Sequence, residues 1–266
     1  MDSYFVFHWG FVDALILAAG RGSRLGGGTT PKCLVEVGGR PLLSYQLKVL
    51  RDAGVGRVTL VVGHCHELVR SVVDEDVEIV HNERYAETNS LYSFSLARAP
   101  VWGELLVLNC DALFPRQVLD RLFEAPKSAL AFDSGSGGKA EHMKVSVRGG
   151  QLVQMSKNLS PRKTHGENVG LIRLTATAAD SAFGAAEALV RGGREQDWLG
   201  EAINAIAREH SISCVDVAGL PWVEIDFPHD LAFARARTWP AIEALHRPRT
   251  SRRAIPLAAG TERAFR

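Results

Sequence analysis

A glycine-rich, basic loop directly after an apolar run is the feature that most constrains this chain. Residues 13–20 read DALILAAG, an apolar run without polar alternation. Such a run predicts a strand buried on both faces, as in a parallel sheet. The next residues read RGSRLGGGTTPK and combine glycines with Arg24 and Lys32. Glycine lets backbone N–H groups approach an anion, and ligands of open α/β sheets bind beyond the carboxyl ends of the strands. The sequence therefore predicts a phosphate-binding loop.

The first half of the chain alternates apolar runs with amphipathic segments. Runs that predict strands occupy residues 13–20, 57–63, 77–82, 104–111 and 128–133. Segments with apolar residues at helical spacing occupy residues 41–54, 66–74, 90–99 and 115–125. This alternation is typical of βαβ units with right-handed crossovers. The predicted fold is therefore α/β, with a Rossmann-like, mostly parallel sheet.

The pattern changes in the second half. Residues 143–157 alternate apolar and polar side chains around Gly149 and Gly150, which predicts a β-hairpin. Further strands are predicted at residues 168–175, 212–219 and 222–226, and helices at 178–193, 197–210 and 228–245. We expect one domain over residues 13–246, in which the hairpin and helices cover the site. An extension at residues 1–12 and a basic, disordered tail at 247–266 flank it.

Charge and cysteine content disfavour several classes of protein. The net charge of +1 gives no field that favours nucleic acid or a membrane surface. The apolar patch at residues 4–12 is too short to span a bilayer and lacks the marks of a signal peptide. The four cysteines form no C-x-x-C pair, which argues against a disulfide framework or zinc ribbon. We expect a cytoplasmic protein without nucleic-acid or membrane partners, and the sequence is compatible with a homodimer.

Two common phosphate-binding motifs do not fit the loop. The third glycine of G-x-G-x-x-G would fall on Leu25, and the lysine of a P-loop would follow glycine, whereas Lys32 follows Pro31. What remains is L-A-A-G-x-G-[ST]-R followed by P-K. It closely resembles the signature of the nucleotidyltransferases that act on sugar phosphates and phospho-alcohols.

This resemblance implies a GT-A-like fold and a set of nucleotide-binding residues. In that family the loop wraps the triphosphate and the base of an NTP, and the lysine reaches the phosphates. The extra GGGTT before Pro31 departs from the family pattern and leaves the path of the loop open. By motif, the expected nucleotide-binding residues are Leu17, Ala18, Ala19, Gly20, Gly22, Ser23, Arg24 and Lys32.

Carboxylates follow two of the predicted strands. Asp111 ends the run ELLVLNCD, and WVEID places Glu224 and Asp226 two residues apart, on one face of an extended segment. Mg²⁺, which neutralises a triphosphate, prefers carboxylates and phosphate oxygens. The resemblance implies that Asp111 and Asp226 share the metal, and Glu224 is a further candidate ligand. Asp230 is expected instead at the N-terminus of the last helix.

The resemblance also suggests the nucleotide. Residues 81–97, HNERYAETNSLYSFSLA, resemble the corresponding stretch of bacterial CTP:phosphocholine cytidylyltransferases, and Asn89 and Ser90 are expected to read the base. The segments MKV…SKNL and WVEIDFP resemble cytidylyltransferases of phosphonate pathways. Together these likenesses extend from Asp13 to Ala244.

Two lysines flank the predicted hairpin. Lys144 and Lys157 are expected, with Arg24 and Lys32, to form the catalytic set, because a dianionic acceptor must approach the α-phosphorus against like charge. A solvated position is the alternative for both hairpin lysines. Aromatic faces suit a quaternary ammonium head group, although core packing is the alternative for each aromatic residue. The candidate acceptor-binding residues are Tyr92, Glu167, Asn168, Trp198 and Trp222.

The combined prediction is an Mg²⁺-dependent cytidylyltransferase that transfers CMP from CTP to a small phosphonate or phospho-alcohol and releases pyrophosphate. Aminoethylphosphonate, hydroxyethylphosphonate and phosphocholine stay open as acceptors. A sugar-phosphate or inositol-phosphate nucleotidyltransferase using CTP, UTP or GTP is the alternative. An inactive nucleotide-sensing regulatory protein is a third class, and it predicts the loss of Lys32, Asp111 or Asp226, all of which are present.

Overall fold

The computed structural model describes residues 12–25, 30–98, 103–136 and 141–246. Predictions for residues 1–11, for glycines 26–28 and for the tail at 247–266 lie outside the described residues. Val12, the last residue of the predicted extension, already belongs to the first strand. No helix of the described ranges is both long enough and apolar enough to cross a membrane.

One large sheet of nine strands organises the described part of the chain. Its strands, in spatial order, are β5 (Val77–His81), β4 (Val58–Val62), β1 (Val12–Ala18), β6 (Glu104–Asn109), β11 (Gly166–Leu174), β8 (Ala129–Asp133), β12 (Ser213–Asp216), β10 (Gln151–Ser156) and β9 (Lys144–Arg148). Strands β5, β4, β1 and β6 are parallel, whereas β11 runs antiparallel to both β6 and β8. The predicted α/β class is confirmed, and the sheet is parallel in its first half and mixed beyond β6.

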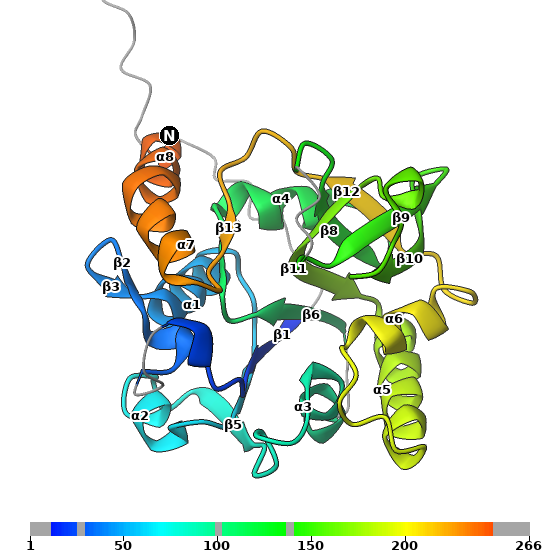
Figure 1. The fold of residues 1–266 in the computed structure, drawn as a ribbon, viewed down its shortest axis with the longest axis horizontal. Coiled ribbons are helices and arrows are strands. Elements are labelled where there is room, and N and C mark those ends of the chain that lie inside the picture. The colour runs from blue at the N-terminus through cyan, green and yellow to red at the C-terminus, as the bar shows by residue number, and fades with distance from the viewer. Residues whose placement is uncertain (1–11, 26–29, 99–102, 137–140, 247–266) are drawn as a thin grey trace, which may run out of the picture.

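The helices cover both faces of this sheet (Figure 1). They are α1 (Leu42–Asp52), α2 (His66–Arg70), α3 (Ser90–Leu96), α4 (Arg116–Glu124), α5 (Ala176–Arg191), α6 (Gly200–Ile206), α7 (Pro228–Phe233) and α8 (Trp239–His246), with a π-helical turn at Ala234–Thr238. Apolar side chains of α1, α4 and α8 join one core cluster, and those of α3, α5 and α6 join the other. Ala14 and Ile16 of β1 face the first cluster, and Leu15 and Leu17 face the second. The apolar run of β1 lacks polar alternation because both its faces are buried.

Two short ladders lie beside the large sheet. Strand β2 (Glu36–Val37) pairs with β3 (Arg40–Pro41), and β7 (Ala112–Leu113) pairs with β13 (Val223–Glu224). The second ladder joins segments that are far apart in the sequence, the turn after β6 and the segment before α7. The β7–β13 ladder therefore brings the residues next to β7 and β13 to the same edge of the large sheet.

The structure adjusts two local predictions. The hairpin of β9 and β10 turns at Gly149 and Gly150, both with positive φ, as predicted. The helix predicted at residues 197–210 is shorter, because the backbone before α6 bonds to the start of α3. There the Leu199 N–H donates to the Ser90 hydroxyl at 2.9 Å. Asn89 caps α3, and its side-chain oxygen accepts from the Ser90 N–H.

Candidate active site

A pocket of about 360 Å³ opens at the carboxyl edge of the parallel strands. Its wall on one side comes from the loop after β1 and from the ends of β5 and β6. The other side comes from β10, β11 and the start of α6. The residues that line it include Leu17, Ala19, Gly20, Gly22, Ser23, Arg24, Lys32, Asn82, Asn89, Ser90, Asp111, Met143, Met155, Lys157, Asn168, Trp198, Leu199, Glu224 and Asp226.

The β7–β13 ladder assembles the three carboxylates that the sequence predicted as metal ligands. Glu224 lies opposite Ala112, and the Ile225 N–H donates to the Asp111 carbonyl at 2.9 Å. Asp111 therefore sits beside the Glu224–Asp226 segment, although more than a hundred residues separate them in sequence. One carboxylate oxygen from each of Asp111, Glu224 and Asp226 lies within 4.8 Å of the other two. We call these three residues the carboxylate cluster.

Helix α7 fixes the Asp226 end of this cluster. The Asp230 carboxylate accepts the backbone N–H of Asp226 at 3.1 Å and that of Phe227 at 2.9 Å. Asp230 is buried and is the third residue of α7, where a carboxylate suits the helix dipole. The predicted place of Asp230 at the start of the last helical segment is confirmed.

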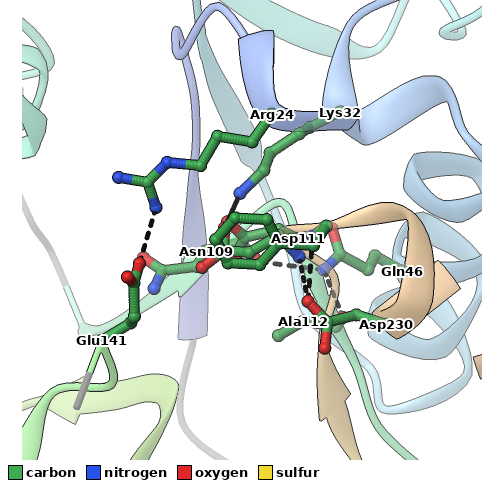
Figure 2. A network of polar contacts seen from close by, with 10 residues as sticks. Arg24, Lys32, Gln46, Asn109, Asp111, Ala112, Glu141 and Asp230 are labelled. Carbon is green, nitrogen blue, oxygen red and sulfur yellow. Dashed lines mark hydrogen bonds and ion pairs between the residues drawn. The ribbon is translucent and has the colours of Figure 1, made fainter. Parts of the chain in front are cut away.

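Lys32 reaches into the carboxylate cluster from the other side (Figure 2). Its ammonium donates to the Asp111 carboxylate at 2.9 Å and also to the Asp226 carboxylate. The loop can approach Lys32 because Gly22 has no side chain. Its φ is +61°, and a Cβ there would lie 3.0 Å from Lys32 Cγ. The glycine spacing of the loop thus has a direct packing reason.

Burial and the paired charges together set the protonation of this cluster. Burial alone would lower the pKa of Lys32, but the charges of Asp111 and Asp226 raise it above its usual value. For Asp226, burial acts to raise the pKa, and the charge of Lys32 with its hydrogen bond holds it below its usual value. Burial, followed by the charges of Asp111 and Asp226, raises the pKa of Glu224 to about 8. Glu224 therefore holds a proton more tightly than an exposed glutamate does, chiefly because its carboxyl group is buried.

These residues fit a hard divalent cation. Three carboxylates offer only oxygen ligands, the donors that Mg²⁺ prefers. Within the described residues, the Asp111 Oδ1 oxygen is buried and has no hydrogen-bond partner. An unsatisfied buried carboxylate oxygen is costly, and a bound cation would satisfy it. Asp111, Glu224 and Asp226 are therefore the residues that could hold a metal.

Arg24 lies at the mouth of the pocket. Its guanidinium pairs with the exposed Glu141 at 3.1 Å and lies over the Phe227 ring, 5.4 Å from the centroid. Figure 2 shows Arg24 and Lys32 extending from the same loop, with Arg24 turned toward Glu141 and Lys32 toward Asp111. Because both partners of Arg24 are at the surface, its guanidinium is available to an entering anion.

Most of the predicted nucleotide-binding residues line the pocket. Ala18 does not, because its side chain belongs to the core cluster on the opposite face of β1. Sequence reasoning missed Asn82, which is buried and donates from its amide to the Thr88 and Ser93 hydroxyls, both at 3.1 Å. Asn82 directly follows β5, so the rule that sites lie at carboxyl strand ends could have found it.

The far side of the pocket combines buried side chains, such as Met155 and Leu199, with the exposed Trp198. The Lys157 ammonium lies over the Trp198 ring, 3.9 Å from the centroid, a cation–π contact. Asn168 lines the same side, and its side-chain oxygen accepts the Gly170 N–H at 3.1 Å. Sequence reasoning missed Met143 and Met155 because methionine carries no distinctive signal. We call Met143, Met155, Lys157, Trp198 and Leu199 the acceptor wall.

Four predicted acceptor-side residues lie outside the pocket lining of the described chain. The Lys144 ammonium donates to the Lys157 carbonyl at 2.6 Å, and the buried Glu167 carboxylate pairs with the His142 ring at 2.8 Å. The Tyr92 ring lies under the Arg84 guanidinium. Trp222 donates its indole N–H to Asp133 at 2.8 Å. In each case a neighbouring polar group within the protein turns the side chain away from the pocket.

Comparisons with known proteins show the family to which the chain is similar. The family model described as MobA-like NTP transferase domain matches residues 14–259. The "Bifunctional IPC transferase and DIPP synthase" of Aquifex aeolicus is 31% identical over 229 residues, which cover 84% of this chain and 50% of that protein. The "CMP-5'-(3-aminopropyl)phosphonate synthase" of Streptomyces rubellomurinus is 32% identical over 258 residues, covering 88% of this chain and 41% of that protein.

A solved structure has the same fold. The inositol-1-phosphate CTP transferase from T. maritima superposes with a TM-score of 0.73 at 23% identity, covering 88% of this chain and 95% of that one. By contrast, this chain spans about half the length of the curated relatives it matches.

Proposed function

This chain belongs to the family of MobA-like NTP transferase domains, and from that premise we propose that it is a cytidylyltransferase. It transfers CMP from CTP to a small phosphonate or phospho-alcohol and releases pyrophosphate. The observation that carries the proposal is the juxtaposition of a glycine-rich loop, Lys32 and the carboxylate cluster in one pocket. We further propose that residues 13–246 form the catalytic domain.

The chemistry needs no protein nucleophile. An oxygen of the acceptor's phosphate or phosphonate attacks the α-phosphorus of the nucleotide and forms the new P–O bond. The bond between the α-phosphorus and the oxygen bridging to the β-phosphate breaks, and pyrophosphate leaves with that electron pair. The acceptor is already ionised at neutral pH, so the protein's task is to align two anions and to screen their charge.

The chain's own residues divide this task. The backbone of the loop at Gly20 and Gly22 and the guanidinium of Arg24 bind the triphosphate, and Lys32 neutralises the charge that develops on the leaving group. Lys157 screens the acceptor from the opposite side. When bound by Asp111, Glu224 and Asp226, Mg²⁺ supplies charge neutralisation of the triphosphate.

The choice of CTP rests on the names of the relatives and on the polar side chains that are proposed to contact the base. The T. maritima and S. rubellomurinus proteins are named for CTP and for a CMP product. Asn82, Asn89 and Ser90 offer amide and hydroxyl groups in the pocket, a donor and acceptor set that suits the edge of cytosine.

An inositol phosphate is the second candidate acceptor. It is favoured by the name of the T. maritima structure, which covers most of this chain. A polyhydroxyl acceptor would need polar partners along its ring, however, and the acceptor wall contains Met143, Met155 and Leu199. A short acceptor with few hydroxyls suits this surface better.

Pyrophosphate release tests the proposal. The protein with Mg²⁺ is mixed with CTP, UTP, GTP or ATP and with phosphocholine, aminoethylphosphonate, hydroxyethylphosphonate, inositol 1-phosphate or glucose 1-phosphate. We expect release with CTP and a short acceptor, and a loss of about 10²–10³-fold in Asp111→Asn, as is typical when one electrostatic stabiliser is removed.

Asp133→Asn is the matched control. Asp133 ends strand β8, but its carboxylate accepts from the Trp222 indole and the Gly135 N–H, outside the pocket. This variant is expected to keep its activity. Release with UTP or GTP but not CTP would overturn the choice of nucleotide, and a full rate in Asp111→Asn would overturn the site.

A further inference from the structure

One buried side chain outside the pocket lining touches the backbone on both sides of Asp111. Gln46 lies in the middle of α1 and is completely buried. Its side-chain nitrogen donates to the Asn109 carbonyl at 2.9 Å and to the Ala112 carbonyl at 2.8 Å. Asn109 precedes Asp111 by two residues, and Ala112 follows it directly. Figure 2 shows Gln46 on the side of this turn opposite to Lys32.

The orientation of this amide is fixed by its partners. Both are carbonyl oxygens, which accept hydrogen bonds only, so the NH₂ group must face them. The amide oxygen is then buried, and within the described residues it has no partner. A buried unpaired oxygen costs about 1–3 kcal/mol. If this side chain served packing alone, an apolar residue of the same length would avoid that free-energy cost.

The two carbonyls belong to the segment that assembles the carboxylate cluster. Ala112 pairs with Glu224 in the β7–β13 ladder, and the Asp111 carbonyl accepts the Ile225 N–H. Holding this turn therefore fixes Asp111 relative to both other carboxylates. Without Gln46 the turn would lose two hydrogen bonds and would have more freedom to rotate the Asp111 side chain.

We propose that Gln46 is a positioning residue for the cation site, acting through the backbone of the turn that carries Asp111. It does not touch substrate. Groups that orient metal ligands typically change metal affinity by about 10- to 100-fold when removed. This inference rests on the proposed function, because it takes the carboxylate cluster to be the cation site of that reaction.

The test substitutes Gln46 with methionine, which keeps the length and burial but donates no hydrogen bond. Mn²⁺ binding to the protein without nucleotide is measured by electron paramagnetic resonance, and the Mn²⁺ concentration for half-maximal pyrophosphate release is measured in parallel. We expect the Mn²⁺ affinity to fall by about 10- to 100-fold and the Mn²⁺ concentration for half-maximal release to rise by the same factor. Because the defect lies in metal affinity, saturating Mn²⁺ should restore most of kcat.

Tyr45→Phe is the matched control on the same helix. The Tyr45 hydroxyl donates to the Phe114 carbonyl at 2.7 Å, beyond the turn that carries Asp111. Loss of the hydroxyl removes a buried hydrogen bond between α1 and the segment after β7, but it leaves the hydrogen bonds to the turn that carries Asp111 in place. We expect a comparable fall in melting temperature in this variant, with Mn²⁺ affinity unchanged.

Three outcomes would overturn the inference. They are unchanged Mn²⁺ affinity in Gln46→Met, an equal loss of affinity in Tyr45→Phe, and absence of Mn²⁺ binding to the parent protein. If Gln46→Met does not fold, the same measurements are made on Gln46→Glu, which keeps the shape of the side chain but loses the paired N–H donors. Failure of both variants to fold would show that Gln46 has a purely structural role. Pyrophosphate release by the parent protein reports on the proposed function separately.

Discussion

The two sides of the pocket are built in different ways. On one side, the side chains of Lys32, Asp111 and Asp226 are 15%, 16% and 15% exposed. The Asp226 N–H donates to Asp230 of α7, and the β7–β13 ladder fixes the backbone beside Asp111. On the acceptor wall, Met155 and Leu199 are buried but Trp198 is 44% exposed, and the methionines are flexible side chains. The contrast suggests that the fixed side serves the triphosphate, which every reaction of this class shares, and that the pliable side serves the acceptor, which differs between relatives.

Energetics follow the same contrast. Removing one partner of a fully buried charge pair lowers the free energy of unfolding of the protein by about 3–5 kcal/mol, because the other charge stays buried without a partner. A cation–π contact at an exposed site contributes only about 0.5–1 kcal/mol. Changes on the carboxylate side should therefore affect both stability and rate, whereas changes at Lys157 and Trp198 should affect acceptor binding alone.

The largest effect is expected from Lys32→Met. The rate of pyrophosphate release should fall by about 10²–10³-fold, because the ammonium that stabilises the developing charge is lost. The free energy of unfolding without metal should fall by about 2–3 kcal/mol, since Asp111 and Asp226 keep their charges but lose their partner. Added Mn²⁺ should recover most of that stability, as measured by thermal unfolding.

Lys48→Met is the control for this variant. Lys48 forms an exposed ion pair with Asp52, four residues on in α1, and such pairs contribute about 0.3–0.5 kcal/mol. Its rate and stability should stay close to those of the parent. If Lys32→Met were as stable as the parent protein, the ion pairs of the carboxylate side would contribute no more to stability than the contacts of the acceptor wall.

An intermediate effect is expected from Lys157→Met. Loss of a charged hydrogen-bond donor should raise the KM for the acceptor by about 10- to 100-fold, while the KM for CTP and the melting temperature stay unchanged. With the ammonium gone from the Trp198 face, acceptors with a cationic head should gain relative to neutral ones. Steady-state kinetics with phosphocholine and hydroxyethylphosphonate measure both effects.

The control for this variant is Lys163→Met, an exposed lysine on the 3₁₀ turn Pro161–Lys163 between β10 and β11. It should leave both KM values unchanged. A rise in the KM for CTP in Lys157→Met would place this lysine on the nucleotide instead of the acceptor.

The smallest effect is expected from Lys144→Met. Its ammonium supports Lys157 through the backbone carbonyl, and a single hydrogen bond contributes about 0.5–1.5 kcal/mol. The KM for the acceptor should therefore rise by only about two- to tenfold. A loss as large as that of Lys157→Met would mean that Lys144 contacts the acceptor itself, as the sequence predicted.

Prediction from the sequence worked well on the carboxylate side and less well on the acceptor wall. Gly22, Lys32, Asp111 and Asp226 were indicated by the family motif together with strand ends and glycine spacing, and the structure brings them to one pocket. Lys144 and Trp222 were predicted to bind the acceptor from their residue type and from their place in segments that resemble the cytidylyltransferases. In the structure each is satisfied by a group elsewhere in the protein, the Lys157 carbonyl and the Asp133 carboxylate.

The sequence by itself determined the α/β alternation, the loop after β1 and the residue types of the cluster, because apolar periodicity and glycine positions are local properties of the chain. Only the tertiary structure decided which carboxylates meet and which lysine faces the pocket. Asp111 reaches Asp226 through the pairing of β7 with β13, and Gln46 supports that pairing from a helix sixty-odd residues earlier. Contacts of such long sequence separation depend on how the layers pack, and no local pattern records them.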